Sequence, residues 1–174
     1  MNHDAFKVRT DVFRVNVRMR GAGTPKPELK PFRKALCTFH DLEIMAVNIY
    51  RFQTTAEKTE HNRLLIAALL NEMTHVQDFQ VKLSEYGFRP SMFRWAYWIL
   101  GMTLGLVSRM LGRKVVLKTG IWVEQKAVRH YGELLESVGW DAETRQVLEK
   151  DREDEMEHVR MWEDLLKPES NRRE

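Results

Sequence analysis

Two Glu-x-x-His motifs, Glu72–His75 and Glu155–His158, are the features of this 174-residue chain that point most directly to chemistry. Side chains three positions apart lie on one face of an α-helix, so each motif can direct a carboxylate and an imidazole at the same ion. About 0.6 such motifs would arise by chance in a chain of this composition. Two motifs alone are therefore weak support for a metal site. Stronger support has to come from their position relative to the apolar residues of the helices.

The elements that position these motifs are predicted to be helices, because apolar residues recur every three or four positions from Pro31 onward. The expected helices span residues 29–57, 60–86, 113–138 and 141–166. Asp141 is a suitable N-cap for the last of them. The sequence therefore predicts an all-α fold, built as a four-helix bundle.

Each predicted helix carries a carboxylate on the apolar stripe that should face the bundle interior. The inward-facing polar residues are Glu43, Glu72, His75, Glu124, Glu155 and His158. Even one isolated buried charge costs several kcal/mol, and no Lys or Arg recurs on these stripes to neutralise the carboxylates. Bound metal would neutralise them. Four carboxylates and two imidazoles form a ligand set for two ions bridged by carboxylates, as in di-iron and di-manganese helical bundles.

The ligand order repeats along the chain, which strengthens the hypothesis. Glu124 follows Glu43 by 81 residues, and the second Glu-x-x-His motif follows the first by 83. We therefore expect two helix pairs with the same ligand layout. The alternative is that the inward faces of the helices are assigned wrongly and that these glutamates lie on the surface.

Other polar residues near these six are candidates for supporting roles. A metal-bound histidine normally donates its second N–H to a carboxylate or a carbonyl. Asp154 and Asn71 each precede a motif glutamate, so each could reach the histidine of the opposite helix; a solvated position is the alternative for Asp154. His40 and His130 lie off the stripes and are expected to be supporting or surface groups. Tyr131 lies on a stripe and could face the cavity, although a core tyrosine is the commoner case.

A segment of different character separates the two halves. Residues 95–108 contain no charge and are apolar on every face, yet they fall short of the roughly 20 residues that cross a bilayer. Arginines and lysines flank both ends of the segment. One interpretation is a crossover helix buried in the bundle or in a homodimer interface. The other is a helix that lies in a membrane surface, with its basic borders against anionic head groups.

Composition limits the remaining classes of protein. Cys37 is the only cysteine, which excludes an intramolecular disulfide framework and a cysteine-based zinc site. A net charge of +3 without a basic helix face argues against a nucleic-acid partner. Residues 1–35 contain no signal-peptide pattern, so we expect a cytoplasmic protein. The expected organisation is an N-terminal arm (1–27), the helical bundle (28–168) and a C-terminal tail (169–174).

Four segments carry a resemblance to a known family. They are HDLEIMA (40–46) with Ile49-Tyr50, Arg89-Pro90-Ser91 with the following apolar segment up to Gly112, Val123-Glu124 with His130-Tyr131, and DEMEH (154–158). These segments resemble the first-ligand motif, the membrane-contacting crossover and the second half of the demethoxyubiquinone hydroxylases. That family consists of ferritin-like di-iron monooxygenases of ubiquinone biosynthesis. The resemblance covers about residues 36–166.

The resemblance implies a ferritin-like bundle in which the six inward-facing residues bind two iron ions, with manganese as the alternative metal. Glu72 and Glu155 would bridge the ions, and Glu43 and Glu124 would complete the catalytic carboxylates. It also implies that the reduced centre activates dioxygen and hydroxylates the ring of a polyprenylated benzoquinol. Residues 95–108 would hold the protein at the inner face of a membrane, as a peripheral membrane protein.

Two departures from the family concern the substrate more than the metal. Leu42 and Met45 stand where the family has small residues, so we expect a narrower substrate pocket. Gln125 follows Glu124 where the family has a second glutamate. Two other functions remain as alternatives: a ferritin-like oxidase or peroxide-scavenging protein without an organic substrate, and a non-catalytic bundle that binds quinone or lipid.

Overall fold

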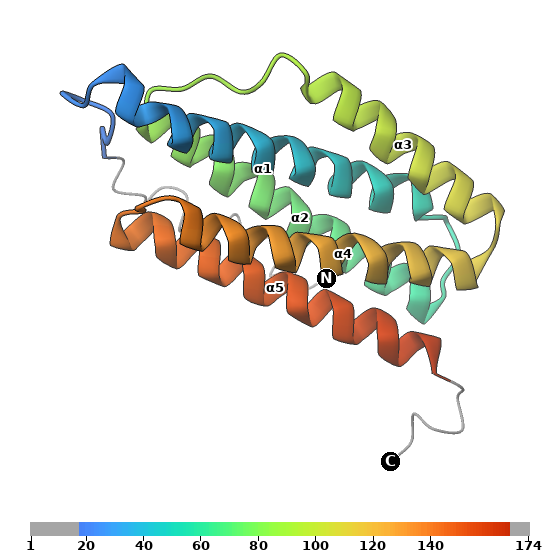
Figure 1. Ribbon diagram of the computed structural model, residues 1–174. Helices are drawn as coiled ribbons and strands as arrows, with labels where there is room; N and C mark the ends of the chain where they lie inside the picture. Colours follow the sequence, from blue (N-terminus) through green and yellow to red (C-terminus); the bar gives the residue numbers. More distant parts are fainter. Residues whose placement is uncertain (1–17, 168–174) are drawn as a thin grey trace, which may run out of the picture.

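The computed structural model describes residues 18–167, and all of its regular elements are α-helices (Figure 1). The helices are α1 (Lys26–Gln53), α2 (Glu60–Glu85), α3 (Arg94–Met110), α4 (Arg113–Ser137) and α5 (Ala142–Leu166). No strand occurs within these described residues. The predicted all-α bundle is confirmed, with α1, α2, α4 and α5 as its helices and α3 as the crossover.

Two hairpins of antiparallel helices build the bundle (Figure 1). Helix α1 packs along α2, α4 packs along α5, and the hairpins meet where α2 faces α5 and α1 faces α4. The apolar core forms two clusters, one around Phe79 and Leu148 and the other around Leu65 and Trp162. The stretches of α2 and α5 between these clusters carry the two Glu-x-x-His motifs, so a polar layer crosses the middle of the bundle.

The helix ends follow from local side-chain contacts. Helix α5 begins at the predicted cap, where Asp141 accepts N–H bonds from the first turn at 3.1 Å. Helix α1 ends at Gln53, four residues before the predicted end. The side chain of Asn62 accepts the backbone N–H of Thr55 at 2.8 Å, which helps to hold the connection to α2 outside the helix. The predicted end of α1 was too late because the apolar pattern contains no information about the hydrogen bond between Thr55 and Asn62.

Glycines allow α3 to approach α1 closely. A Cβ atom at Gly105 would lie 2.6 Å from the carbonyl oxygen of Ile49, and Gly101 faces α1 in the same way. The outer side of α3 is exposed, with Trp95 at 62% and Met110 at 83%. The interpretation of α3 as a helix buried within the bundle is therefore wrong. Across residues 18–167, no helix has the length and apolar character needed to traverse a membrane.

The predicted arm and tail lie largely outside the described residues, which exclude 1–17 and 168–174. The division of the chain at residues 27 and 168 therefore stays a prediction. The described residues just before α1 contact the bundle through Arg20.

Arg20 ties the segment before α1 to one end of the bundle. Its guanidinium is only 9% exposed and lies 2.6 Å from Glu85 and 2.5 Å from both Asp141 and Glu143. Its backbone N–H also donates to the carbonyl of Glu85 at 2.8 Å. Burial opposes the charge of Glu85, but Arg20 and Lys82 hold the pKa of this carboxyl below its usual range. Arg20 thus joins the N-terminal segment to α2 and α5.

Replacing Arg20 by methionine should lower the free energy of unfolding by about 3 kcal/mol, because buried Glu85 would lose a cationic partner. Chemical denaturation followed by circular dichroism measures this loss. Arg18→Met is the matched control, since Arg18 is 56% exposed and pairs with Glu143, which is 44% exposed. We expect the control to change stability by less than about 1 kcal/mol. Equal losses in the two variants would contradict the bridging role of Arg20.

Candidate metal centre

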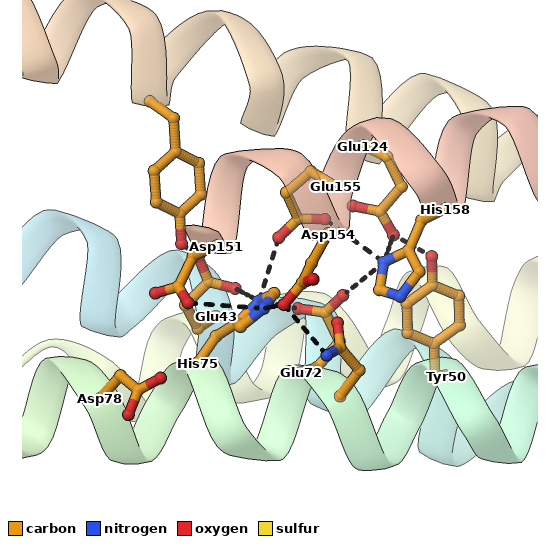
Figure 2. Close-up of polar contacts among 12 residues, drawn as sticks. Glu43, Tyr50, Glu72, His75, Asp78, Glu124, Asp151, Asp154, Glu155 and His158 are labelled. Atoms are coloured by element: carbon orange, nitrogen blue, oxygen red, sulfur yellow. Dashed lines mark hydrogen bonds and ion pairs between the residues drawn. The ribbon is translucent and has the colours of Figure 1, made fainter. Parts of the chain in front are cut away.

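The six polar residues that were predicted to face inward meet in the middle of the bundle (Figure 2). Their potential ligand atoms form two overlapping groups, and within each group all atoms lie within 4.8 Å of one another. One group is Glu43, Glu72, His75 and Glu155, and the other is Glu72, Glu124, Glu155 and His158. Glu72 and Glu155 belong to both groups. The cluster therefore offers two adjacent positions, each with one histidine and one carboxylate of its own.

The two histidines present the same nitrogen to the same pair of carboxylates. His75 Nδ1 lies 3.2 Å from Glu155 and 3.5 Å from Glu72. His158 Nδ1 lies 3.1 Å from Glu72 and 3.4 Å from Glu155. All four side chains are at most 8% exposed. The centre thus has approximate two-fold symmetry, as the repeated ligand order along the chain suggests.

Burial dominates the electrostatics of the outer carboxylates. It raises the pKa of Glu43 and Glu124 well above the usual range, and the charges of neighbouring glutamates add to this effect. Burial also opposes the charge of Glu72, but the two histidines outweigh it and lower the pKa of this carboxyl. At His158, Glu155 and Glu72 outweigh burial and raise the pKa to about 10. At His75, Asp154 and the cluster glutamates outweigh burial and raise the pKa well above its usual value. Without metal, burial thus favours the protonated form of the outer carboxylates, and the neighbouring carboxylates favour the protonated form of the histidines.

Several polar atoms of the cluster are buried without a hydrogen-bond partner. They are both carboxylate oxygens of Glu72 and Glu155, Oε2 of Glu124, and Nδ1 of His75 and His158. A buried polar atom left unpaired costs about 1–3 kcal/mol. Carboxylate oxygens and imidazole nitrogens are donors that divalent transition-metal ions bind. The donor set and its unpaired atoms fit a bound metal.

Two buried tyrosines hold the outer carboxylates of the cluster. Tyr131 donates to Glu43 Oε1 at 2.6 Å, and Tyr50 donates to Glu124 Oε1. Trp162 in turn donates to the hydroxyl of Tyr50 at 3.0 Å. Each tyrosine lies seven residues after the glutamate of its own helix and contacts the glutamate of the other helix. Sequence reasoning considered Tyr131 and missed Tyr50, although the repeated Glu-x6-Tyr spacing could have revealed both.

The outer nitrogens of the two histidines have different surroundings. Asp154 Oδ2 lies 3.1 Å from His75 Nε2, the first of the two alternatives considered for it, and this contact is the main reason why the pKa of Asp154 is lowered. Asn71, a candidate partner for His158, instead donates its amide to Asp154 at 3.3 Å. Asp151, which sequence reasoning missed, is fully buried 3.8 Å from His75 Nε2, and burial raises its pKa to about 6. The acidic residues thus gather behind His75.

The other two candidate histidines lie apart from both groups of ligand atoms. His40 is buried, with Nδ1 3.8 Å from Asp41 Oδ1. His130 is exposed and lines a cavity that leads to the cluster. These positions fit the supporting and surface roles that were expected for them.

This cavity opens between α1, α3 and α4 and has a volume of about 340 Å³. Glu43, Glu124 and Glu155 line it at the cluster. Most of the remaining wall is apolar and comprises Phe39, Leu42, Met45, Ala46, Leu100, Leu104, Trp122, Val123 and Ala127. Pockets of about 300–1,000 Å³ with apolar walls and few polar groups are typical of small-molecule sites. The cavity could therefore bring an apolar ligand to three carboxylates of the cluster.

A bundle of two helical hairpins with a crossover helix and a buried carboxylate–histidine cluster is typical of ferritin-like metal-binding proteins. Comparison with known protein families identifies the particular family. The family model described as "Ubiquinone biosynthesis protein COQ7" matches residues 34–166, and the chain belongs to this family.

Two curated relatives share this part of the chain at low identity. A Dictyostelium discoideum protein named "NADPH-dependent 3-demethoxyubiquinone 3-hydroxylase, mitochondrial" is 26% identical over 125 residues, which is 69% of this chain and 58% of the relative. A protein of Ectopseudomonas mendocina (strain ymp) named "3-demethoxyubiquinol 3-hydroxylase" is 28% identical over 122 residues, or 69% of this chain and 57% of the relative. The chain thus spans less than two thirds of the length of either relative.

Proposed function

We propose that this chain is a di-iron monooxygenase that uses dioxygen to hydroxylate a demethoxyubiquinol-like ring at a membrane surface. The observation that carries the proposal is an apolar cavity that ends on Glu43, Glu124 and Glu155, within a buried cluster suited to two metal ions. Membership of the ubiquinone-biosynthesis family and the names of the two relatives support this reaction class.

Six buried side chains would hold the two ions. Glu72 and Glu155 would contact both, while the other four ligands would divide as Glu43 with His75 and Glu124 with His158. Bound iron would supply dioxygen activation and the transfer of one oxygen atom to the ring. Manganese suits the same donors, so metal analysis of the purified protein has to identify the ion.

The protein itself would contribute fixed ligands and a dry cavity. Hydrogen bonds from Tyr131 and Tyr50 orient Glu43 and Glu124. Burial raises the pKa of both tyrosines well above the usual value, so their hydroxyls remain hydrogen-bond donors at neutral pH. Asp154 fixes the ring of His75 through Nε2. A bound ring would displace water from the apolar wall around the reacting space.

The substrate would enter from the side of α3. Leu100 and Trp122 are about half exposed and line the cavity, next to the exposed apolar side of α3. We propose that residues 95–108 lie on a membrane and that a quinol moves from the lipid into the cavity between α3 and α4. A homodimer that covers the same side of α3 is the alternative arrangement. Leu42 and Met45 line the cavity and would limit the size of ring substituents.

The alternative functions differ in what they require of this cavity. An oxidase for ferrous ions or peroxide needs access for small polar reactants, and a largely apolar cavity of about 340 Å³ favours an organic substrate instead. A non-catalytic quinone-binding bundle would use the cavity without metal. The buried carboxylate and imidazole atoms of the cluster that lack a hydrogen-bond partner favour a metal centre over that function.

Supplying the iron-loaded chain with a short-tailed demethoxyubiquinol, a chemical reductant and ¹⁸O₂ tests the proposal. We expect a ring-hydroxylated product that contains one ¹⁸O atom, detected by mass spectrometry. Oxidation of ferrous ions without a ring product would favour the oxidase. Quinone binding by a chain that retains no metal would favour the non-catalytic function.

Filling the cavity should impair turnover without removing the metal. Leu104→Trp places a larger side chain in the cavity wall, and we expect kcat/KM for the quinol to fall about 10- to 200-fold. Val107→Trp is the matched control, because Val107 lies one turn further along α3, is 48% exposed and does not line the cavity. Steady-state kinetics and metal analysis of both variants separate the effects. Unchanged kinetics in Leu104→Trp would place the substrate elsewhere.

A further inference from the structure

A second apolar groove lies on the other side of α3, between α1, α2 and α3. Its lining consists of Ile44, Val47, Asn48, Arg51, Met73, Val76, Arg94, Trp95 and Trp98. Its volume is about 480 Å³, within the range of ligand sites. It shares no lining residue with the cavity that reaches the metal cluster. Helix α3 therefore separates two cavities, of which only the one described above contacts carboxylates of the cluster.

The groove combines an apolar floor with positive charge. Arg51 and Arg94 are exposed, and neither guanidinium forms an ion pair within residues 18–167. No acidic residue is among the described residues that line the groove. Val47 is nearly buried at the floor, and Met73 is 47% exposed at the edge. This combination suits a ligand that has an apolar chain and an anionic group.

Asn48 adds a third type of contact. Its side chain is 2% exposed, and its Nδ2 donates to the carbonyl of Ile44 at 2.7 Å. Its Oδ1 is buried without a hydrogen-bond partner. An unpaired buried acceptor is costly, and a donor group on a ligand in the groove would satisfy it. The groove thus offers a hydrogen-bond acceptor beside its two cations.

We propose that this groove binds an anionic phospholipid that carries a hydroxyl group in its head group, such as phosphatidylglycerol. One acyl chain lies along Val47, Val76 and Met73, and the phosphate contacts Arg51 and Arg94. A head-group hydroxyl donates to Asn48 Oδ1. The rings of Trp95 and Trp98 flank the groove, where tryptophan suits the boundary between head groups and acyl chains.

The neighbouring surface supports a lipid rather than a small anion. Exposed apolar side chains continue from the groove along α2 at Ile66 and Leu70 and just before α3 at Met92 and Phe93. A free phosphate would use the arginines and leave the apolar floor without a partner. This inference concerns a site separate from the metal centre and holds whether or not the proposed oxygenase activity is correct.

Binding of short-chain phosphatidylglycerol, dispersed below its critical micelle concentration, tests the proposal on the full chain. Native mass spectrometry and tryptophan fluorescence measure its affinity beside that of phosphatidylcholine of equal chain length. We expect tighter binding of phosphatidylglycerol. Arg51→Gln and Arg94→Gln should each weaken it about fivefold, the effect of one basic residue at an anionic lipid. Met73→Glu, a substitution at an exposed position, should weaken it as well.

The double variant Arg51→Gln with Arg94→Gln has a matched control in Arg89→Gln with Arg109→Gln, which also removes two positive charges near α3 but from residues that do not line the groove. The control should retain its affinity for phosphatidylglycerol and its metal content. Equal losses in the groove and control variants would reduce the effect to general charge attraction and overturn the proposal. Inorganic phosphate that competes fully with the lipid, or a dimer that Met73→Glu dissociates in a chain that binds no lipid, would also overturn it.

Discussion

Replacing Glu72 by glutamine should remove both metal ions and lower product formation by at least about 100-fold. Glu72 belongs to both groups of ligand atoms, so its carboxylate would contact both ions. Loss of a residue that only hydrogen-bonds to a metal ligand already lowers metal affinity or activity about 10- to 100-fold. Loss of a ligand shared by both ions should have a larger effect. Metal analysis of the purified variant, together with the ¹⁸O product assay, measures both effects.

His158→Ala provides the comparison, because His158 belongs to only one of the two groups. We expect its metal content to fall toward one ion per chain and its oxygen chemistry to be lost. Glutamine keeps the volume of Glu72, but it removes the anion that lies near both His75 and His158. Helical circular dichroism must therefore show that the variant is folded. A folded Glu72→Gln protein with two ions and full activity would refute the assignment of this cluster.

The sequence was sufficient to predict the helices and the inward-facing polar residues for one physical reason. A helix that packs in a bundle must bury an apolar stripe, so a charged residue on that stripe is conspicuous. Glu43 and Glu124 interrupt such stripes, and both are almost fully buried in the structure. Their role as metal ligands, by contrast, is not tested by the fold and stays a prediction.

Contacts between distant residues could not be predicted in this way. Arg20 reaches Glu85 and Asp141, and no local period relates these positions. Tyr50 lies on the first stripe and reads as an ordinary core residue until the structure shows its hydroxyl at Glu124. Only the comparison of the two halves, each with a tyrosine seven residues after its glutamate, contains that information.

The position of α3 was undetermined for a different reason. A segment that is apolar on every face is predicted to avoid water, but its sequence does not indicate whether protein or lipid covers it. The glycines at 101 and 105 fix the side that packs on α1. The other side of the helix is exposed, and a cavity lies on each of its flanks. Which partner covers that side depends on molecules outside the chain.

Metal binding should release protons near neutral pH. Four ligands hold protons more tightly in the folded metal-free protein than in the unfolded chain. Burial raises the pKa of Glu43 and Glu124, and carboxylate neighbours that outweigh burial raise the pKa of His75 and bring that of His158 to about 10. A metal ligand must give up its proton, so binding displaces these protons. Apparent affinity should rise by about one logarithmic unit per pH unit for each proton released.

The metal-free protein should respond to pH in the opposite sense. A group whose pKa is raised by folding contributes its full stability below its unfolded pKa, about 4 for Glu and 6.5 for His, and loses it as pH rises through the folded value. For His158 that loss extends up to about pH 10. Glu72, whose pKa is lowered, instead loses its contribution as pH falls below about 4. Between about pH 6 and 8 the raised groups dominate, so the melting temperature of the metal-free protein should fall.

The gap between the melting temperatures of the loaded and metal-free proteins should therefore widen as pH rises over that range. Calorimetric titration with ferrous or manganous ions, in two buffers of different ionisation heat, counts the protons released. Glu43→Gln is the informative variant, because glutamine carries no titratable proton and removes one ligand from one position only. On metal binding, this variant should release fewer protons in total than the unsubstituted protein. Binding heats that do not depend on the buffer would mean that the ions bind without displacing these protons, and would place them outside the buried cluster.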